Sequence, residues 1–290
     1  MLSFAGVLVD GLSYGALLFL MAVGLSVTLG LMGFVNLAHT ALAMVGGYLM
    51  VAFTQRAGFS FGWAVLCAVI GTTALGVLLE RSIFRLTYRR DALVQVLLTI
   101  GVMLMVSASM IYLFGPSLQM IQIPEELKGR VSLGPLDASR YRLMLLAVSV
   151  VLLIALLAGF ERTRFGTMVR AAVDNQRVAA ALGIPIQKVF MTTFAVGTAL
   201  AALGGALGVE ALGLDPAFAM KHLILALLVV VVGGAGSIGG TFVAAMVLAV
   251  FDIACKYYVP AIGSFAMYGL MLAVLLIRPQ GIRGVKGAAA

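Results

Sequence analysis

The chain has 290 residues, of which 63% are hydrophobic and only 10% are charged. Soluble domains carry about a quarter charged residues, so a chain this apolar could not cover its own surface in water, and the composition indicates a membrane protein. The net charge of +8 does not favour nucleic acid binding, because the basic residues lie in loops between apolar runs rather than on one basic face.

Eight runs of the chain contain no Asp, Glu, Lys or Arg: 12–31, 33–54, 57–79, 92–115, 143–160, 189–209, 223–251 and 257–277. Most are close to the roughly 20 residues that a helix needs to cross the hydrocarbon, and they do not alternate as the strands of a barrel do. The sequence therefore predicts one all-α domain over residues 1–290, a polytopic integral membrane protein with eight or nine transmembrane helices. The first residues lack a basic n-region and a cleavage site, so we expect mature chain there rather than a signal peptide.

Glycines interrupt two parts of these runs. Run 223–251 has GGAGSIGG at its centre (233–240), and the passage 30–47 carries glycines in a similar way. The loops on either side require run 223–251 to return to the side where it began, so we expect two short spans or a re-entrant pair of half-helices. Non-helical backbone at that depth is buried in protein or lines a water-filled path, and broken segments in both halves of a transporter indicate the substrate path.

Basic residues predict which loops face the cytoplasm. They cluster in the loop with Arg81, Arg85, Arg89 and Arg90, in the loop 161–188, and in the tail with Arg278, Arg283 and Lys286. We expect these three segments on the inside. The loop 116–142 must then face outside, although it also contains four basic residues. The parity of the helices places the N-terminus outside as well.

The loop 161–188 is the one long polar passage between apolar runs. Its Ala-rich middle, 170–182, predicts a helix that Gly183 ends, and Pro185 then begins the next helix. The result is a rigid knob on the cytoplasmic face, against which another protein could push.

Context excludes several apparent catalytic signals. Residues 234–239 match the dinucleotide-binding pattern GxGxxG but lie in an apolar run, and no P-loop sequence occurs. Two histidines and two cysteines without a carboxylate cluster predict no metal site, no cofactor and no disulfide. His39 lies within an apolar run, where an ionisable group is costly. We expect either a role in transport or a neutral imidazole bonded to a neighbouring helix.

Four motifs resemble signatures of the permeases of branched-chain amino acid ABC importers. They are 33–39 (GFVNLAH) with 46–48 (GGY), the loop residues 174–184, the glycine passage 233–240, and 278–282 (RPQGI) in the tail. They occur in the family's order over nearly the whole chain, and the Asn-Leu-Ala-His form is more similar to the H-type than to the M-type subunit. Thr40 stands where the family often has Gly, and the loop lacks the Glu that other importers carry there.

The resemblance implies a set of partners. A periplasmic binding protein would deliver the substrate, and this chain with an M-type permease would form the path in the lipid of the bacterial inner membrane. Two cytoplasmic ATPase subunits would dock on the loop 161–188 and drive transport, so the chain itself would be a transporter subunit and not an enzyme.

The resemblance also implies two sets of site residues. We expect Asn36 and His39 to share one face of a helix, because they are three residues apart, and to line the path with Gly233, Gly234, Gly236, Ser237, Gly239 and Gly240. The ATPase contact is expected at Arg170, Asp174, Asn175, Arg177, Ala179, Ala180, Gly183, Ile184 and Pro185.

Two alternatives stay open at the level of the sequence. The cargo could be urea, a short amide or another small polar solute, because nothing in the chain distinguishes these from an amino acid. A stand-alone channel or secondary transporter is the other alternative. It is disfavoured because no Asp, Glu, Lys or Arg lies deep inside a run to couple transport to protons or sodium, although Asp10, Glu210 and Asp252 at the edges of runs keep it open. An intramembrane enzyme has no catalytic constellation to support it.

Overall fold

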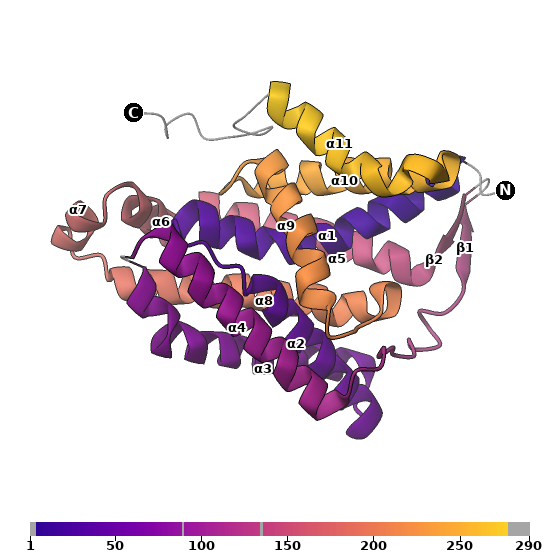
Figure 1. Cartoon of the computed structure of the whole chain (residues 1–290), viewed down its shortest axis with the longest axis horizontal. Helices are drawn as coiled ribbons and strands as arrows, with labels where there is room; N and C mark the ends of the chain where they lie inside the picture. Colours follow the sequence, from indigo (N-terminus) through magenta and orange to yellow (C-terminus); the bar gives the residue numbers. More distant parts are fainter. Residues whose placement is uncertain (1–3, 89, 134–135, 278–290) are drawn as a thin grey trace.

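A computed structural model describes residues 4–88, 90–133 and 136–277. Within these residues the regular elements are helices and one hairpin of two antiparallel strands (Figure 1). The elements are α1 (Phe4–Met32), α2 (His39–Val51), the π-helical turn η1 (Ala52–Arg56), α3 (Phe61–Ser82), the 3-10 turn η2 (Phe84–Thr87), α4 (Ala92–Phe114), β1 (Arg130–Leu133), β2 (Leu136–Ser139), α5 (Arg140–Glu161), α6 (Arg164–Asp174), α7 (Gln176–Ala181), α8 (Ile186–Leu212), α9 (Phe218–Gly233), α10 (Ile238–Tyr258) and α11 (Pro260–Ile277).

The predicted all-α, polytopic architecture is confirmed. In the described part of the chain, six helices are long and apolar enough to cross a membrane: α1, α3, α4, α5, α8 and α10. α9 and the described end of α11 are shorter apolar helices. This inventory is compatible with eight or nine crossings, and the hairpin β1–β2 lies in the loop between α4 and α5.

Helix α1 occupies the centre of the bundle (Figure 1), and 83% of its spanning window is buried. Its glycines allow this, because lipid offers no hydrophobic drive between helices and small residues let backbones approach. A Cβ added at Gly15 would lie 3.0 Å from Met246 Cα of α10, and one added at Gly204 of α8 would lie 3.1 Å from Met21 N. The backbones of neighbouring helices therefore approach closely at both positions.

Both predicted glycine interruptions are real breaks in the helices. α1 ends at Met32 and α2 begins at His39, so residues 33–38 are unwound. α9 ends at Gly233 and α10 begins at Ile238. Gly33, Gly234 and Gly236 have φ values of +62°, +92° and +82°, which glycine adopts far more readily than residues with a Cβ.

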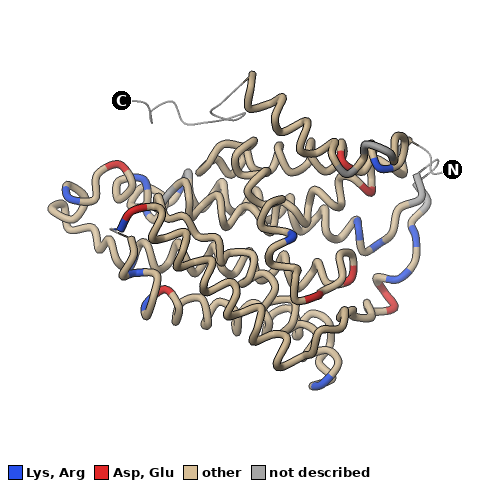
Figure 2. Tube along the Cα trace, viewed as in Figure 1, with Lys and Arg blue, Asp and Glu red and all other residues tan. Residues whose placement is uncertain are grey.

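The two ends of the molecule differ in what they carry. α6 and α7 lie at one end, whereas the beginning of α1 and the hairpin lie at the other (Figure 1). Most charged residues gather toward these two ends (Figure 2). The turn η2 shares a cavity with α7, so the basic loop after α3 and the basic loop after α5 meet at the same end, as the charge pattern predicted. The basic tail lies outside the described residues, as does Arg89.

Three of the four basic residues in the loop 116–142 have acidic or carbonyl partners. Arg142 is paired with Asp10, and Lys128 Nζ lies 2.6 Å from Glu125 Oε1. Arg140 donates a hydrogen bond to the carbonyl of Glu126 at 3.4 Å. This local compensation explains how the loop 116–142 can carry four basic residues without resembling the other basic end.

Candidate substrate path and docking loop

The unwound segment between α1 and α2 contains Asn36, and His39 begins α2. Asn36 is fully buried, and its Oδ1 accepts a hydrogen bond from the backbone N–H of Ala38 at 3.1 Å. The prediction that Asn36 and His39 share a helix face is wrong, because Asn36 precedes the helix. Asn36 instead forms the turn into α2, where its carbonyl accepts from the N–H of His39 at 3.4 Å.

His39 is buried between three helices. Its ring lies against Gly24 of α1, where an added Cβ would be 2.6 Å from His39 Cε1, and Gly24 also adjoins the backbone of Gly197 in α8. Among the described residues, His39 Nε2 and Asn36 Nδ2 have no hydrogen-bond partner. Buried polar atoms are normally satisfied, and the hydroxyls of Tyr48, Thr72 and Thr198 also lack a partner among the described residues.

The backbone of the unwound segment is held by α4. The N–H of Val35 donates to Gln95 Oε1 at 3.0 Å, and the N–H of Leu37 donates to Thr99 Oγ1 at 3.2 Å. Gln95 and Thr99 are both buried. In lipid every backbone polar group needs an internal partner, and α4 supplies two of them. The charge pattern of the apolar runs did not indicate either residue, because neither side chain is ionisable. Their polar side chains inside the run 92–115 were the available signal.

The second break packs against the end of α1. The N–H of Gly236 donates to the carbonyl of Ser26 at 3.1 Å, and Thr241 Oγ1 donates to Ser26 Oγ at 2.9 Å. Ser237 caps α10, since its hydroxyl accepts from the N–H of Gly240 at 3.1 Å. Gly30 lies directly under Gly236. Both breaks therefore adjoin the last two turns of α1.

Burial varies among the glycines predicted to line the path. Gly233, Gly234 and Gly240 are buried, whereas Gly236 and Gly239 are half-buried, like Ser237. A Cβ at Gly233 would lie 2.7 Å from the backbone of Thr241. Gly233 and Gly240 thus bring the ends of α9 and α10 together, which is a packing role. Their part in a substrate path stays a prediction.

The docking loop, residues 161–188, has two helices where one was predicted. The expected helix 170–182 is divided, because α6 ends at Asp174 and α7 begins at Gln176. Asn175 has φ −153° and ψ 99°, and its Oδ1 accepts from the N–H groups of Arg177 and Val178, both at 3.1 Å. An Asn side chain that caps the next helix offers the backbone an alternative to continuing the first one.

The corner after α7 forms as predicted. Gly183 has φ +83°, and its N–H donates to the carbonyl of Ala180 while that of Ile184 donates to Ala179, both at 3.0 Å. This pair of bonds is the Schellman motif that ends many helices. Pro185 then directly precedes α8.

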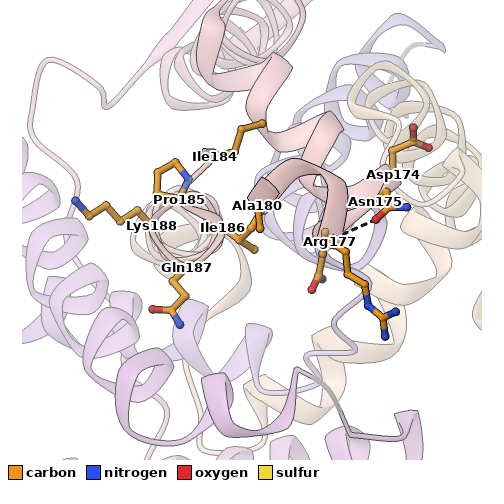
Figure 3. Close-up of a pocket in the computed structure, with 10 residues that line it drawn as sticks. Asp174, Asn175, Arg177, Ala180, Ile184, Pro185, Ile186, Gln187 and Lys188 are labelled. Atoms are coloured by element: carbon orange, nitrogen blue, oxygen red, sulfur yellow. Dashed lines mark hydrogen bonds between the residues drawn. The ribbon is translucent and has the colours of Figure 1, made fainter. Parts of the chain in front are cut away.

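The loop presents a groove between α7 and the first turn of α8 (Figure 3). It has a volume of about 1040 Å³ and is lined by Asp174, Asn175, Gln176, Arg177, Ala180, Ile184, Pro185, Ile186, Gln187 and Lys188. Ala179 is buried within the chain, whereas Val178 and Leu182 are 54% and 76% exposed. Apolar side chains that project from a polar loop are typical of a surface that another protein covers.

Arg170 does not join this groove. Its guanidinium donates hydrogen bonds to the carbonyl of Phe160 and to Thr167 Oγ1, so it fastens α6 to the end of α5. Arg177, in contrast, is exposed at the groove.

The family model described as the permease component of branched-chain amino acid transport systems matches residues 7–276. The chain belongs to this permease family. It is therefore a multi-pass membrane protein of a transport system, which confirms the family and the transport role predicted from the four motifs.

Relatives of known name agree with this assignment. The high-affinity branched-chain amino acid transport permease BraD of Pseudomonas aeruginosa is 26% identical over 96% of this chain and 94% of its own length. LivH of Escherichia coli, described in the same words, is 24% identical over 95% of this chain and 94% of its own. A probable LivH of Methanocaldococcus jannaschii is 26% identical over 96% and 92%. No solved structure matches the chain.

Proposed function

We propose that this chain is the H-type permease subunit of an ABC importer for branched-chain or related amino acids in the bacterial inner membrane. A second permease subunit, two cytoplasmic ATPase subunits and a periplasmic binding protein complete the transporter. The docking loop supports this proposal most directly: it is a capped, rigid knob that exposes Val178 and Leu182 beside a large groove.

The geometry of the knob suits the transmission of a push. α7 is capped at both ends by its own residues, Asn175 and Gly183, and the corner leads directly into α8. α8 is 27 residues long and packs along α1, α2 and α3. A force applied to α7 therefore reaches the centre of the bundle through one continuous helix.

The two breaks suit a small zwitterion. Where helices end inside the bundle, their N-termini attract a carboxylate and their C-termini attract an ammonium group. Asn36 Nδ2 and His39 Nε2 add two unpartnered polar atoms near one break. In this proposal they face the substrate path.

Substitution of Gly183 by Val tests the docking loop. Gly183 has φ +83° and no neighbouring atom within 4 Å of an added Cβ, so the change strains the corner by about 1–2 kcal/mol without a clash. We expect normal membrane insertion, and loss either of the ATPase from the purified complex or of uptake driven by ATP hydrolysis.

Gly58→Val is the matched control. Gly58 has φ +67° and equally open surroundings, but it precedes α3, far along the chain from the docking loop. It should retain the ATPase and uptake. If Gly183→Val also retains both, the corner is not the coupling contact. If the unaltered chain recovers no ATPase when expressed with its genomic neighbours, and conducts solute alone in liposomes, the importer assignment fails.

A further inference from the structure

The segment that joins α3 to α4 lies beside the docking loop. We call residues 83–88 the elbow; it contains η2. The elbow and the docking loop line one cavity of about 310 Å³, formed by Glu80, Arg85, Leu86, Tyr88, Gln176, Ile186, Gln187 and Phe190. A movement of α7 would therefore displace the elbow as well as α8.

Tyr88 fixes the shape of the elbow. Its hydroxyl lies 3.1 Å from Glu80 Oε1, and its ring packs edge-on against Phe190 of α8 with the centroids 5.8 Å apart. Burial, together with the charge of Glu80, raises the pKa of the Tyr88 hydroxyl. The hydroxyl thus stays protonated and donates to Glu80 Oε1.

Gln95 joins the elbow to the unwound segment. Its Nε2 donates to the carbonyl of Thr87 at 3.2 Å and to that of Arg90 at 3.1 Å. Its Oε1 accepts from the N–H of Val35 at 3.0 Å. One buried amide thus uses both of its ends, one on each non-helical segment.

Aromatic rings also connect the elbow to the unwound segment, but they fix the relative position of the two segments less strictly than the hydrogen bonds of Gln95 do. Phe34 packs against Phe84 and Tyr88 of the elbow, with centroids 5.6 and 5.1 Å apart, and Phe84 packs against Phe194 of α8 at 5.6 Å. Ring contacts tolerate sliding, whereas hydrogen bonds fix direction and distance.

We propose that Gln95 is a positioning residue that ties the elbow to the unwound segment 33–38, so that displacement of the docking loop moves the backbone beside Asn36 and His39. This inference rests on the proposed function. The proposal requires that the elbow and the unwound segment change position together. Proximity alone does not establish such coupling, so it has to be measured.

The test uses the complete importer with a single reactive thiol in the unwound segment. Leu37→Cys, half-buried, is placed in a chain with Cys67→Ser and Cys255→Ser and reconstituted with the permease, ATPase and binding-protein partners. The rate of maleimide labelling at position 37 is measured with and without ATP, together with uptake and ATP hydrolysis. In the chain that keeps Gln95, the labelling rate at position 37 should depend on ATP.

Gln95→Met keeps the length of the side chain and removes all three hydrogen bonds. We expect the ATPase to co-purify as before, the ATP dependence of labelling to disappear, and uptake per ATP hydrolysed to fall about tenfold. Gln95→Glu is the second variant, in case Gln95→Met does not fold: it keeps the acceptor for Val35 but loses the amide donors to the elbow, and should give the same loss of ATP dependence.

Thr99→Val is the matched control on the same helix. It removes the bonds of the Thr99 hydroxyl to the N–H of Leu37 and the carbonyl of Val35. It leaves the bonds of Gln95 Nε2 to the carbonyls of Thr87 and Arg90 intact, so labelling should still respond to ATP. Full ATP dependence and uptake in both Gln95 variants would overturn the positioning role while the importer assignment stands. Failure of the unaltered chain to recruit an ATPase would overturn both.

Discussion

Polar side chains inside the bundle fall into two kinds. Gln95 and Thr99 satisfy the backbone of the unwound segment and are themselves satisfied. Asn36 and His39 each keep one buried nitrogen without a partner among the described residues. An unpartnered buried group lowers stability, so its retention suggests a use in transport rather than in folding.

A substitution at His39 tests the role of its unpartnered nitrogen. His39→Leu fills a similar volume and removes the unpartnered Nε2 together with the ring's hydrogen bond to the backbone of Met21. These two losses oppose one another, so we expect the free energy of unfolding to change by no more than about 1–3 kcal/mol, while uptake falls about tenfold through loss of the polar contact. Thermal unfolding in detergent and uptake in vesicles measure the two effects. His222→Ala, which alters a half-buried histidine bonded to the carbonyl of Phe218 in its own helix, is the control and should leave uptake unchanged. Equal uptake by His39→Leu would make His39 a packing residue.

At the scale of elements, close approach of backbones determines how the two breaks are placed. Gly30 lets the turn at Gly236 rest on α1, and there the turn gains two acceptors from Ser26. The second break is thus anchored to the same helix that leads into the first. Movement of the end of α1 would displace both non-helical segments together.

Gly30→Ala should disturb this arrangement. The added methyl group meets the backbone of Gly236, which cannot rotate away as a side chain can, and overpacking of this kind costs about 1–3 kcal/mol. Gly101→Ala in α4 has no atom within 4 Å and should be neutral or stabilising by about 0.5–1 kcal/mol. The unfolding temperatures of Gly30→Ala and Gly101→Ala are compared. Equal values would show that the turn at Gly236 is not held on α1.

At the scale of the whole molecule, two basic loops meet at one end and a charge-compensated hairpin lies at the other. The positive-inside bias assigns the first end to the cytoplasm. In the proposed importer, the docking loop and the elbow would then face the ATPase, and the hairpin would face the binding protein.

Thiol labelling from one side of the membrane checks this orientation. Leu182→Cys and Glu125→Cys occupy exposed positions at opposite ends, each in a chain with Cys67→Ser and Cys255→Ser. A membrane-impermeant maleimide should label Leu182→Cys only in inside-out vesicles and Glu125→Cys only in right-side-out vesicles. The reverse pattern would place the docking loop outside and exclude a cytoplasmic ATPase contact there.

The sequence by itself determined the membrane class, the helical architecture, the two breaks and the corner at Gly183. Each of these follows from local chemistry: uncharged runs of spanning length, glycines that accept positive φ, and Gly followed by Pro at a helix end. The four motifs were enough to indicate the family. The division of the predicted helix 170–182 was missed at Asn175. An Asn side chain can cap a new helix or lie within a continuing one, and the local sequence does not decide between the two.

Only the tertiary structure decided which residues satisfy the unwound backbone, which glycines bring helices into contact, and which side chains of the docking loop are exposed. Gln95 is 60 residues from Val35 and Gly236 is 210 from Ser26. No local pattern specifies such pairs, because a hydrogen-bond donor in one segment places no constraint on the sequence of the segment that will accept it. The fold brings them together, since lipid leaves each exposed backbone group no other partner.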